Sequence, residues 1–153
     1  NWSEEFIASY RKRLNPEYEE EITEYSFAMI EFNKGNFEKS LRHLSKINIE
    51  RSNMKLGIKN LMIVIYYELN YKEELISLID TYKHFLQRDT TMTRQSIHIT
   101  RLFLKFVSQL VKIYHNENYE NVYQLKEKIE STPYFDLKSW LIRKADELID
   151  KRK

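Results

Sequence analysis

Histidine and cysteine are the first side chains to examine for chemistry, because they supply most metal ligands and many nucleophiles. The chain has no cysteine, which excludes disulfides and thiolate chemistry and favours the cytosol. It has four histidines, His43, His84, His98 and His115. They include no His-Glu-x-x-His pair, and no cysteine can complete a ligand set. We therefore expect no zinc site and no other metal.

Ser40 lies one helical turn before His43, which is a spacing that a nucleophile and its base can adopt. No third group in the sequence orients this pair, and a surface helix produces the spacing by chance. The glutamates that follow Pro16 could hold a metal or a basic ligand, although negative charge also suits a helix start. They are Glu17, Glu19, Glu20 and Glu21. Two glycines provide no glycine-rich phosphate loop. We expect no enzymatic activity and no cofactor.

A stripe of basic residues at helical spacing could bind an anionic ligand. Its members are Arg94, His98, Arg101, Lys105 and Lys112, and Asp89 is the only acid in residues 83–112. The alternative interpretation is the solvated outer face of a helix. No aromatic platform is interleaved with the basic residues, and a net charge of +2 indicates neither DNA nor an acidic partner. The sequence therefore favours the solvated face, and nucleic acid is not the expected partner.

The elements that carry these residues are predicted to be helices. Glycine and proline number two each, which favours long uninterrupted helices over a turn-rich β fold. A chain of 153 residues with 42% hydrophobic and 31% charged residues is typical of a soluble globular domain. The longest apolar run, residues 61–67, is too short to span a bilayer, and no signal-peptide pattern begins the chain. We expect a cytoplasmic, all-α protein with no membrane contact.

The segment from Phe32 to Leu44 reads as a helix end, a tight turn at Gly35-Asn36, and a new helix. The pair Asn36-Phe37, an Asn followed by an aromatic residue, recurs at Asn70-Tyr71 and at Asn118-Tyr119. The first interval is 34 residues, the period of a two-helix repeat. The second is 14 residues longer, close to four helical turns. This predicts an elongated hairpin over residues 71–116 that turns near residues 89–91.

Apolar periodicity places about eight helices along the chain and no strand. Gly35 is expected in the left-handed conformation, Gly57 against a neighbouring backbone, and Asp136 as the N-cap of the last helix. The predicted ranges are residues 3–14, 16–32, 37–46, 54–69, 71–87, 93–115, 119–130 and 136–150.

These turns and periods resemble the tetratricopeptide repeat (TPR) family, with repeats at 21–54, 55–88 and 103–136. The first repeat matches best, through Phe27, Ala28, Gly35, Asn36, Phe37, Ser40, Leu44 and Ile47. The second keeps Leu61, Asn70, Tyr71 and Leu78 but has Met62 and Glu74 at positions for small residues. The third keeps Phe106, Asn118, Tyr119 and Ile129 but has Gln109 and Lys126 at apolar positions.

The resemblance implies a right-handed solenoid of antiparallel helix pairs in one domain, residues 1–153. In this scheme residues 1–16 are the remnant of a preceding repeat, and residues 136–150 form a terminal capping helix. The whole pattern is similar to the C-terminal part of long bacterial helical-repeat proteins. The missing N-terminal repeats of such a protein are one candidate for covering the surface of this chain.

In the TPR family the first helix of each pair lines a concave groove. The resemblance maps that groove to Tyr25, Met29, Phe32, Asn33, Lys59, Asn60, Ile63, Tyr66, Tyr67, Val111, Tyr114 and His115. Only Asn60 fits the family's clamp for acidic C-terminal tails, so that clamp is not expected. An aromatic and apolar groove suits a helix or a hydrophobic peptide. The alternatives are that the protein's own repeats fill the groove, or that Met29 and Ile63 belong to the core.

The sequence therefore predicts a non-catalytic protein–protein interaction module, or scaffold, and leaves its oligomeric state open. Nucleic-acid contact through the basic stripe and a purely structural end-cap of a longer array are the alternatives. Replacing Tyr66 and Tyr67 by Ala is expected to abolish partner binding and to leave the melting temperature nearly unchanged.

Overall fold

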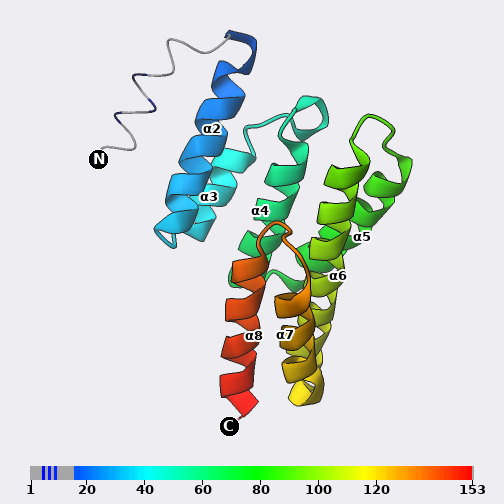
Figure 1. Ribbon diagram of the computed structural model, residues 1–153. Helices are drawn as coiled ribbons and strands as arrows, with labels where there is room; N and C mark the ends of the chain where they lie inside the picture. The colour runs from blue at the N-terminus through cyan, green and yellow to red at the C-terminus, as the bar shows by residue number, and fades with distance from the viewer. Residues whose placement is uncertain (1–4, 6, 8, 10–15, 153) are drawn as a thin grey trace. The chain divides into compact units, whose positions relative to one another are not determined.

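The computed structural model describes residues 5, 7, 9 and 16–152, and every regular element in this part of the chain is helical (Figure 1). The predicted all-α class is confirmed, whereas the helix predicted over residues 3–14 lies largely outside the described residues. No helix that the structure describes is both long and apolar enough to cross a membrane. The elements are α2 Pro16–Asn33, α3 Phe37–Leu44, η1 Ile49–Arg51, α4 Lys55–Glu68, α5 Lys72–Arg88, α6 Arg94–Asn116, η2 Tyr119–Asn121, α7 Val122–Ser131 and α8 Lys138–Arg152.

The chain divides into two compact units. The N-terminal unit is Asn1–Leu78 and the C-terminal unit is Ile79–Lys153. Their boundary falls inside α5, and therefore inside the predicted repeat 55–88.

Two turns of the N-terminal unit share one hydrogen-bond pattern. Gly35 has φ +78°, and the Asn36 N–H donates to the Glu31 carbonyl at 2.8 Å. Asn70 has φ +57°, and the Tyr71 N–H donates to the Tyr66 carbonyl at 2.9 Å. Both are Schellman-type helix ends, in which a left-handed residue follows the last turn. Asn70 therefore corresponds to Gly35 and not to Asn36, so the sequence alignment of the two turns was wrong by one residue.

A side-chain hydrogen bond joins the starts of α3 and α5. The Tyr71 hydroxyl, next to the first residue of α5, donates to the Glu38 carboxylate near the start of α3. This hydrogen bond is the main cause that raises the pKa of Tyr71. Corresponding ends of two successive helix pairs are thus in contact within the N-terminal unit.

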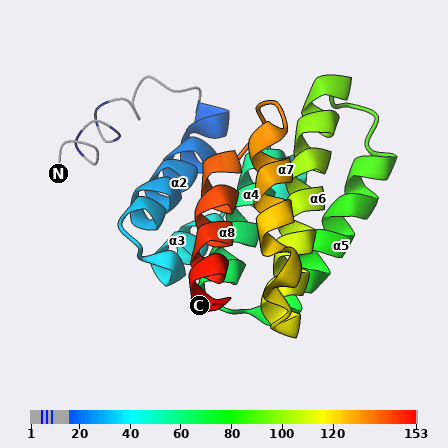
Figure 2. The same cartoon turned by 60° about the horizontal axis from the view of Figure 1, so that its bottom comes forward.

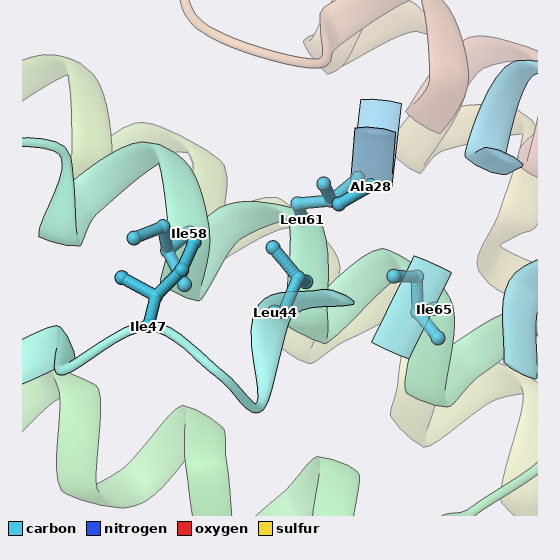
Figure 3. Packing of buried hydrophobic residues seen from close by; sticks show 6 residues of the cluster. All are labelled: Ala28, Leu44, Ile47, Ile58, Leu61 and Ile65. Carbon is cyan, nitrogen blue, oxygen red and sulfur yellow. The ribbon is translucent and has the colours of Figure 1, made fainter. Parts of the chain in front are cut away.

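Small residues allow α2 and α3 to pack closely. Ala28 and Ser40 are both fully buried, and the Ser40 hydroxyl donates to the Ala28 carbonyl at 2.7 Å. Leu44 from α3 and three residues of α4 complete the core of this unit (Figure 3). The cluster consists of Ala28, Leu44, Ile47, Ile58, Leu61 and Ile65.

Gly57 lies in α4 beside a tyrosine rather than beside a backbone. A Cβ at this position would lie 2.9 Å from the Tyr25 hydroxyl oxygen, which is closer than van der Waals contact allows. The close approach predicted for Gly57 is present, but its partner is a side chain of α2.

The C-terminal unit contains α6, α7 and α8 side by side (Figure 2). Phe106 of α6 stacks on Phe135 of the α7–α8 loop, with ring centroids 5.4 Å apart, and both side chains are buried. Thr93 caps α6 by accepting a hydrogen bond from the Ser96 N–H at 3.1 Å. α5 ends at Arg88, which agrees with the predicted turn near residues 89–91.

The predicted N-cap of the last helix was wrong. α8 begins at Lys138, and the residue before it, Leu137, has φ +60°. Asp136 therefore lies outside the cap position, and its carboxylate accepts a hydrogen bond from the Tyr134 hydroxyl at 3.3 Å. The start of α8 is set by a leucine in the left-handed conformation, which a sequence gives no reason to expect for this residue type.

We expect Gly35→Val to lower the free energy of unfolding by about 1–2 kcal/mol, because the left-handed conformation penalises a side chain with a Cβ. The cost comes from the backbone conformation, since an added Cβ has no atom within 4 Å outside the adjacent residues. Urea denaturation measures the change. Gly35→Asn is the matched control, because Asn70 already adopts this conformation in the equivalent turn. A Val variant as stable as the Asn variant would contradict the assignment.

Candidate functional site

Three residues mapped to the aromatic groove are buried on α4. The exposed fractions are 3% for Asn60, 0% for Ile63 and 8% for Tyr67. Val111 of α6 is also buried. Such residues offer almost no surface to a partner.

The groove residues of α2 pack against the core of the N-terminal unit. Tyr25, Met29 and Phe32 are partly buried against the core cluster of Figure 3, which agrees with the core alternative. Asn33 at the end of the same helix is exposed. The α2 part of the proposed groove is therefore mainly interior.

The remaining groove residues are partly exposed. Lys59 and Tyr66 lie on α4, and the Tyr66 ring lies 6.2 Å from that of Tyr71. Burial raises the pKa of Tyr66, and the carboxylate of Glu74 adds to the increase. Tyr114 and His115 belong to the C-terminal unit, where the Lys151 ammonium lies 5.2 Å from the centre of the Tyr114 ring. Tyr66 and Tyr114 are thus in contact with side chains of their own unit.

The basic stripe, by contrast, is exposed along its whole length. Arg94, His98, Arg101, Lys105 and Lys112 are all exposed, and α6 contains no acidic residue. They lie on one side of a single helix over about 27 Å, from the rise of 1.5 Å per residue. None forms an ion pair with another described residue.

A surface hollow of about 270 Å³ lies between α5 and α6 in the C-terminal unit. We call it the basic hollow. Leu86 and Leu104 form its floor, each with 2% of its surface exposed. The other lining residues are Lys83, Gln87, Arg101 and Lys105.

The basic hollow combines matching sets from two helices. Lys83, Leu86 and Gln87 follow the i, i+3, i+4 pattern on α5, and Arg101, Leu104 and Lys105 follow it on α6. Sequence reasoning found Arg101 and Lys105 but missed Lys83 and Gln87. The signal was present, because an antiparallel hairpin brings like-spaced residues of its two helices together.

Ser40 and His43, the nucleophile–base candidates, both serve the packing of α2 on α3. The Ser40 hydroxyl is buried and donates to a backbone carbonyl. The His43 Nδ1 lies 2.5 Å from the Glu24 carboxylate, and the His43 ring stacks on Phe27 at 5.5 Å. Glu24 is thus an orienting group that sequence reasoning did not find. The serine that would complete a triad is already bonded elsewhere.

Glu24 also accepts a hydrogen bond from the Lys46 ammonium at 3.1 Å. Burial alone raises the pKa of Glu24, but the hydrogen bonds from His43 and Lys46 outweigh it, so that the pKa is lowered overall. Because the folded pKa lies below the unfolded value, this carboxylate stabilises the fold above the unfolded pKa. The contribution is lost as the pH falls through the folded pKa.

We therefore expect the stability difference between the wild type and Glu24→Gln to be largest near pH 6 and to shrink below about pH 4.5, the ordinary value for a glutamate. Denaturant melts of both proteins at several pH values between 3 and 6 measure it. A difference that is constant over this range would show that the pKa of Glu24 is the same in the folded and unfolded states.

Among the glutamates after Pro16, Glu21 helps to hold the linker before α4. The Ser52 hydroxyl donates to Glu21 at 2.6 Å and accepts from the Met54 N–H at 2.9 Å, which fixes the linker before α4. Within the described part of the chain, no group of three or more His, Asp or Glu side chains is arranged to hold a metal ion. His84 and His98 are exposed.

Comparison with protein-family models, with curated proteins and with solved structures finds no match for this chain. The resemblance to TPR proteins therefore rests on the residues of this chain alone.

Proposed function

We propose that this chain is a non-catalytic protein-binding module built from TPR-like helix pairs, and that it binds an acidic segment of its partner. The binding surface is the basic face of the C-terminal unit rather than the aromatic groove. This face consists of Lys83, Arg94, His98, Arg101, Lys105 and Lys112.

The observation that carries the proposal is the basic hollow. Three cations, Lys83, Arg101 and Lys105, surround an apolar floor and form no ion pair with other residues that the structure describes. Charge of one sign attracts the opposite charge over about 8–10 Å at ordinary ionic strength. A partner with carboxylates therefore gains both association rate and orientation here.

The apolar floor favours protein over nucleic acid as the partner. Binding to a phosphate backbone requires only positive charge, and its affinity falls steeply with salt. Protein interfaces instead gain most of their affinity from an apolar centre inside a polar rim. The aliphatic stems of the three cations, together with the uppermost atoms of Leu86 and Leu104, supply that centre, and the charged heads supply the rim.

The helix pairs support a binding role over a catalytic one. Ser40 and His43 are held by the packing of α2 on α3, as described above. The matching turns at Gly35 and Asn70 indicate repeated units, and repeated units expose successive helices as extended binding surfaces.

We expect the double change Arg101→Glu with Lys105→Glu to weaken binding of a fluorescent Glu-rich peptide by on the order of tenfold or more, because attraction becomes repulsion. Fluorescence anisotropy measures the dissociation constant. The control is Lys39→Glu with Arg42→Glu, which reverses two exposed cations of α3 in the N-terminal unit.

Two results would contradict the proposal. Equal weakening by both double variants would mean that the effect is overall charge rather than this face. Tighter binding of a single-stranded RNA of equal charge than of the peptide would assign the face to nucleic acid.

A further inference from the structure

We propose that the basic hollow is a specificity site that takes one large apolar side chain, flanked by carboxylates, from an acidic partner segment. The inference rests on the proposed function and adds the sequence feature that the partner must carry. An acidic segment without an apolar residue would then be a poor ligand.

The size of the basic hollow fits a side chain. Its volume of about 270 Å³ is far more than one bound ion needs. It is below the range of about 300–1,000 Å³ that is usual for sites of whole small molecules. A single large side chain that enters from a peptide lies between these limits.

The apolar floor also suits an apolar group better than a purely ionic ligand. Leu86 and Leu104 are almost completely buried, so only their uppermost atoms line the hollow. These atoms cannot satisfy a phosphate or a carboxylate, whereas an apolar side chain placed over them is removed from water. An anion therefore binds at the rim and leaves the floor for an apolar group.

The rim completes the site on both sides. Lys83 comes from α5, and Arg101 and Lys105 come from α6, so that cations flank the floor from two helices. Their aliphatic stems can line the walls while their charged heads stay in water. Carboxylates before and after the apolar residue therefore meet opposite charge.

The test uses three twelve-residue peptides on the whole chain, with binding measured by fluorescence anisotropy at 50 and 300 mM NaCl. The first contains Glu and Ser with one central Phe. The second has Ser in place of the Phe, and the third keeps the Phe but has Gln in place of every Glu. We expect the first to bind about tenfold tighter than the second, because burial of the phenyl group is favourable. This ratio should persist at 300 mM NaCl, because salt screens the charges but not the apolar contact.

A filled-site variant provides the second measurement. Gln87 is exposed, so Gln87→Trp should fold and place its ring over the floor. We expect this variant to bind the first and second peptides equally and to keep the weaker binding that depends on charge. Gln124→Trp, at an exposed position of α7, is the matched control and should keep the preference.

The outcomes separate the two proposals. Equal binding of the first two peptides to the wild type overturns the specificity site but leaves the binding of acidic segments standing. No binding of any peptide overturns both. Tighter binding of single-stranded RNA than of every peptide, unaffected by Gln87→Trp, assigns the face to nucleic acid and also overturns the site. The peptide comparison needs no variant, so it decides the matter even if Gln87→Trp does not fold.

Discussion

Phe135→Ala is expected to lower the free energy of unfolding by about 3–5 kcal/mol, the range found when a buried aromatic side chain is removed. Phe135 lies in the loop between α7 and α8 and has no exposed surface. Its ring stacks on Phe106 of α6 at 5.4 Å, so it bridges the loop to the longest helix of the C-terminal unit. The variant would leave a cavity next to Phe106 in the core of the C-terminal unit.

The neighbouring residue provides the control. Tyr134 is also aromatic but is 76% exposed, so Tyr134→Ala should change stability by less than about 0.5 kcal/mol. Urea denaturation, followed by circular dichroism, measures both variants. If the two lose similar amounts of stability, Phe135 does not lie in the core and the α7–α8 loop is placed incorrectly.

The positions of the helices followed from the sequence because their signals are local. The predicted range 16–32 became α2 Pro16–Asn33, and 93–115 became α6 Arg94–Asn116. The apolar period and Pro16 at the first helical position both act within one or two turns. The left-handed conformation of Gly35 was predicted for the same reason.

The alignment of the two turns was wrong because both glycine and asparagine can take the left-handed position at a helix end. Asn70 takes the left-handed position that Gly35 takes in the first turn, because asparagine tolerates this conformation. Glu117 and Leu137 also have positive φ, although neither residue type favours it. A residue type that disfavours the left-handed conformation gives no signal for it in a single sequence.

The candidate site depended on tertiary packing and was predicted only in part. The groove positions came from the TPR resemblance, which assumes that one side of α4 is open. In the structure seven residues of α4 are buried, among them Asn60, Ile63 and Tyr67. The continuous apolar run of residues 61–67 was the available signal, because a helix that is apolar all round is a buried helix. Glu24 beside His43 had no comparable signal, since 19 residues separate them.

Tyr67→Ala decides whether this side of α4 lines an open groove or belongs to the core. Tyr67 has 8% of its surface exposed, and we expect its loss to lower the free energy of unfolding by about 3 kcal/mol or more. The sequence alone predicted the opposite, a double variant of Tyr66 and Tyr67 with a nearly unchanged melting temperature. Tyr66 is half-buried and rests on the Tyr71 ring, so Tyr66→Ala should lose about 1 kcal/mol, less than Tyr67→Ala.

The two single variants form a matched pair, because they remove the same side chain from adjacent positions of one helix. Denaturant melts give their order directly. If Tyr67→Ala is the more destabilised, this part of α4 belongs to the core, and binding of acidic peptides should be judged on variants of α5 and α6 instead. If both melt with the wild type, the two tyrosines are free to contact a partner. The aromatic groove would then compete again with the basic face as the binding surface.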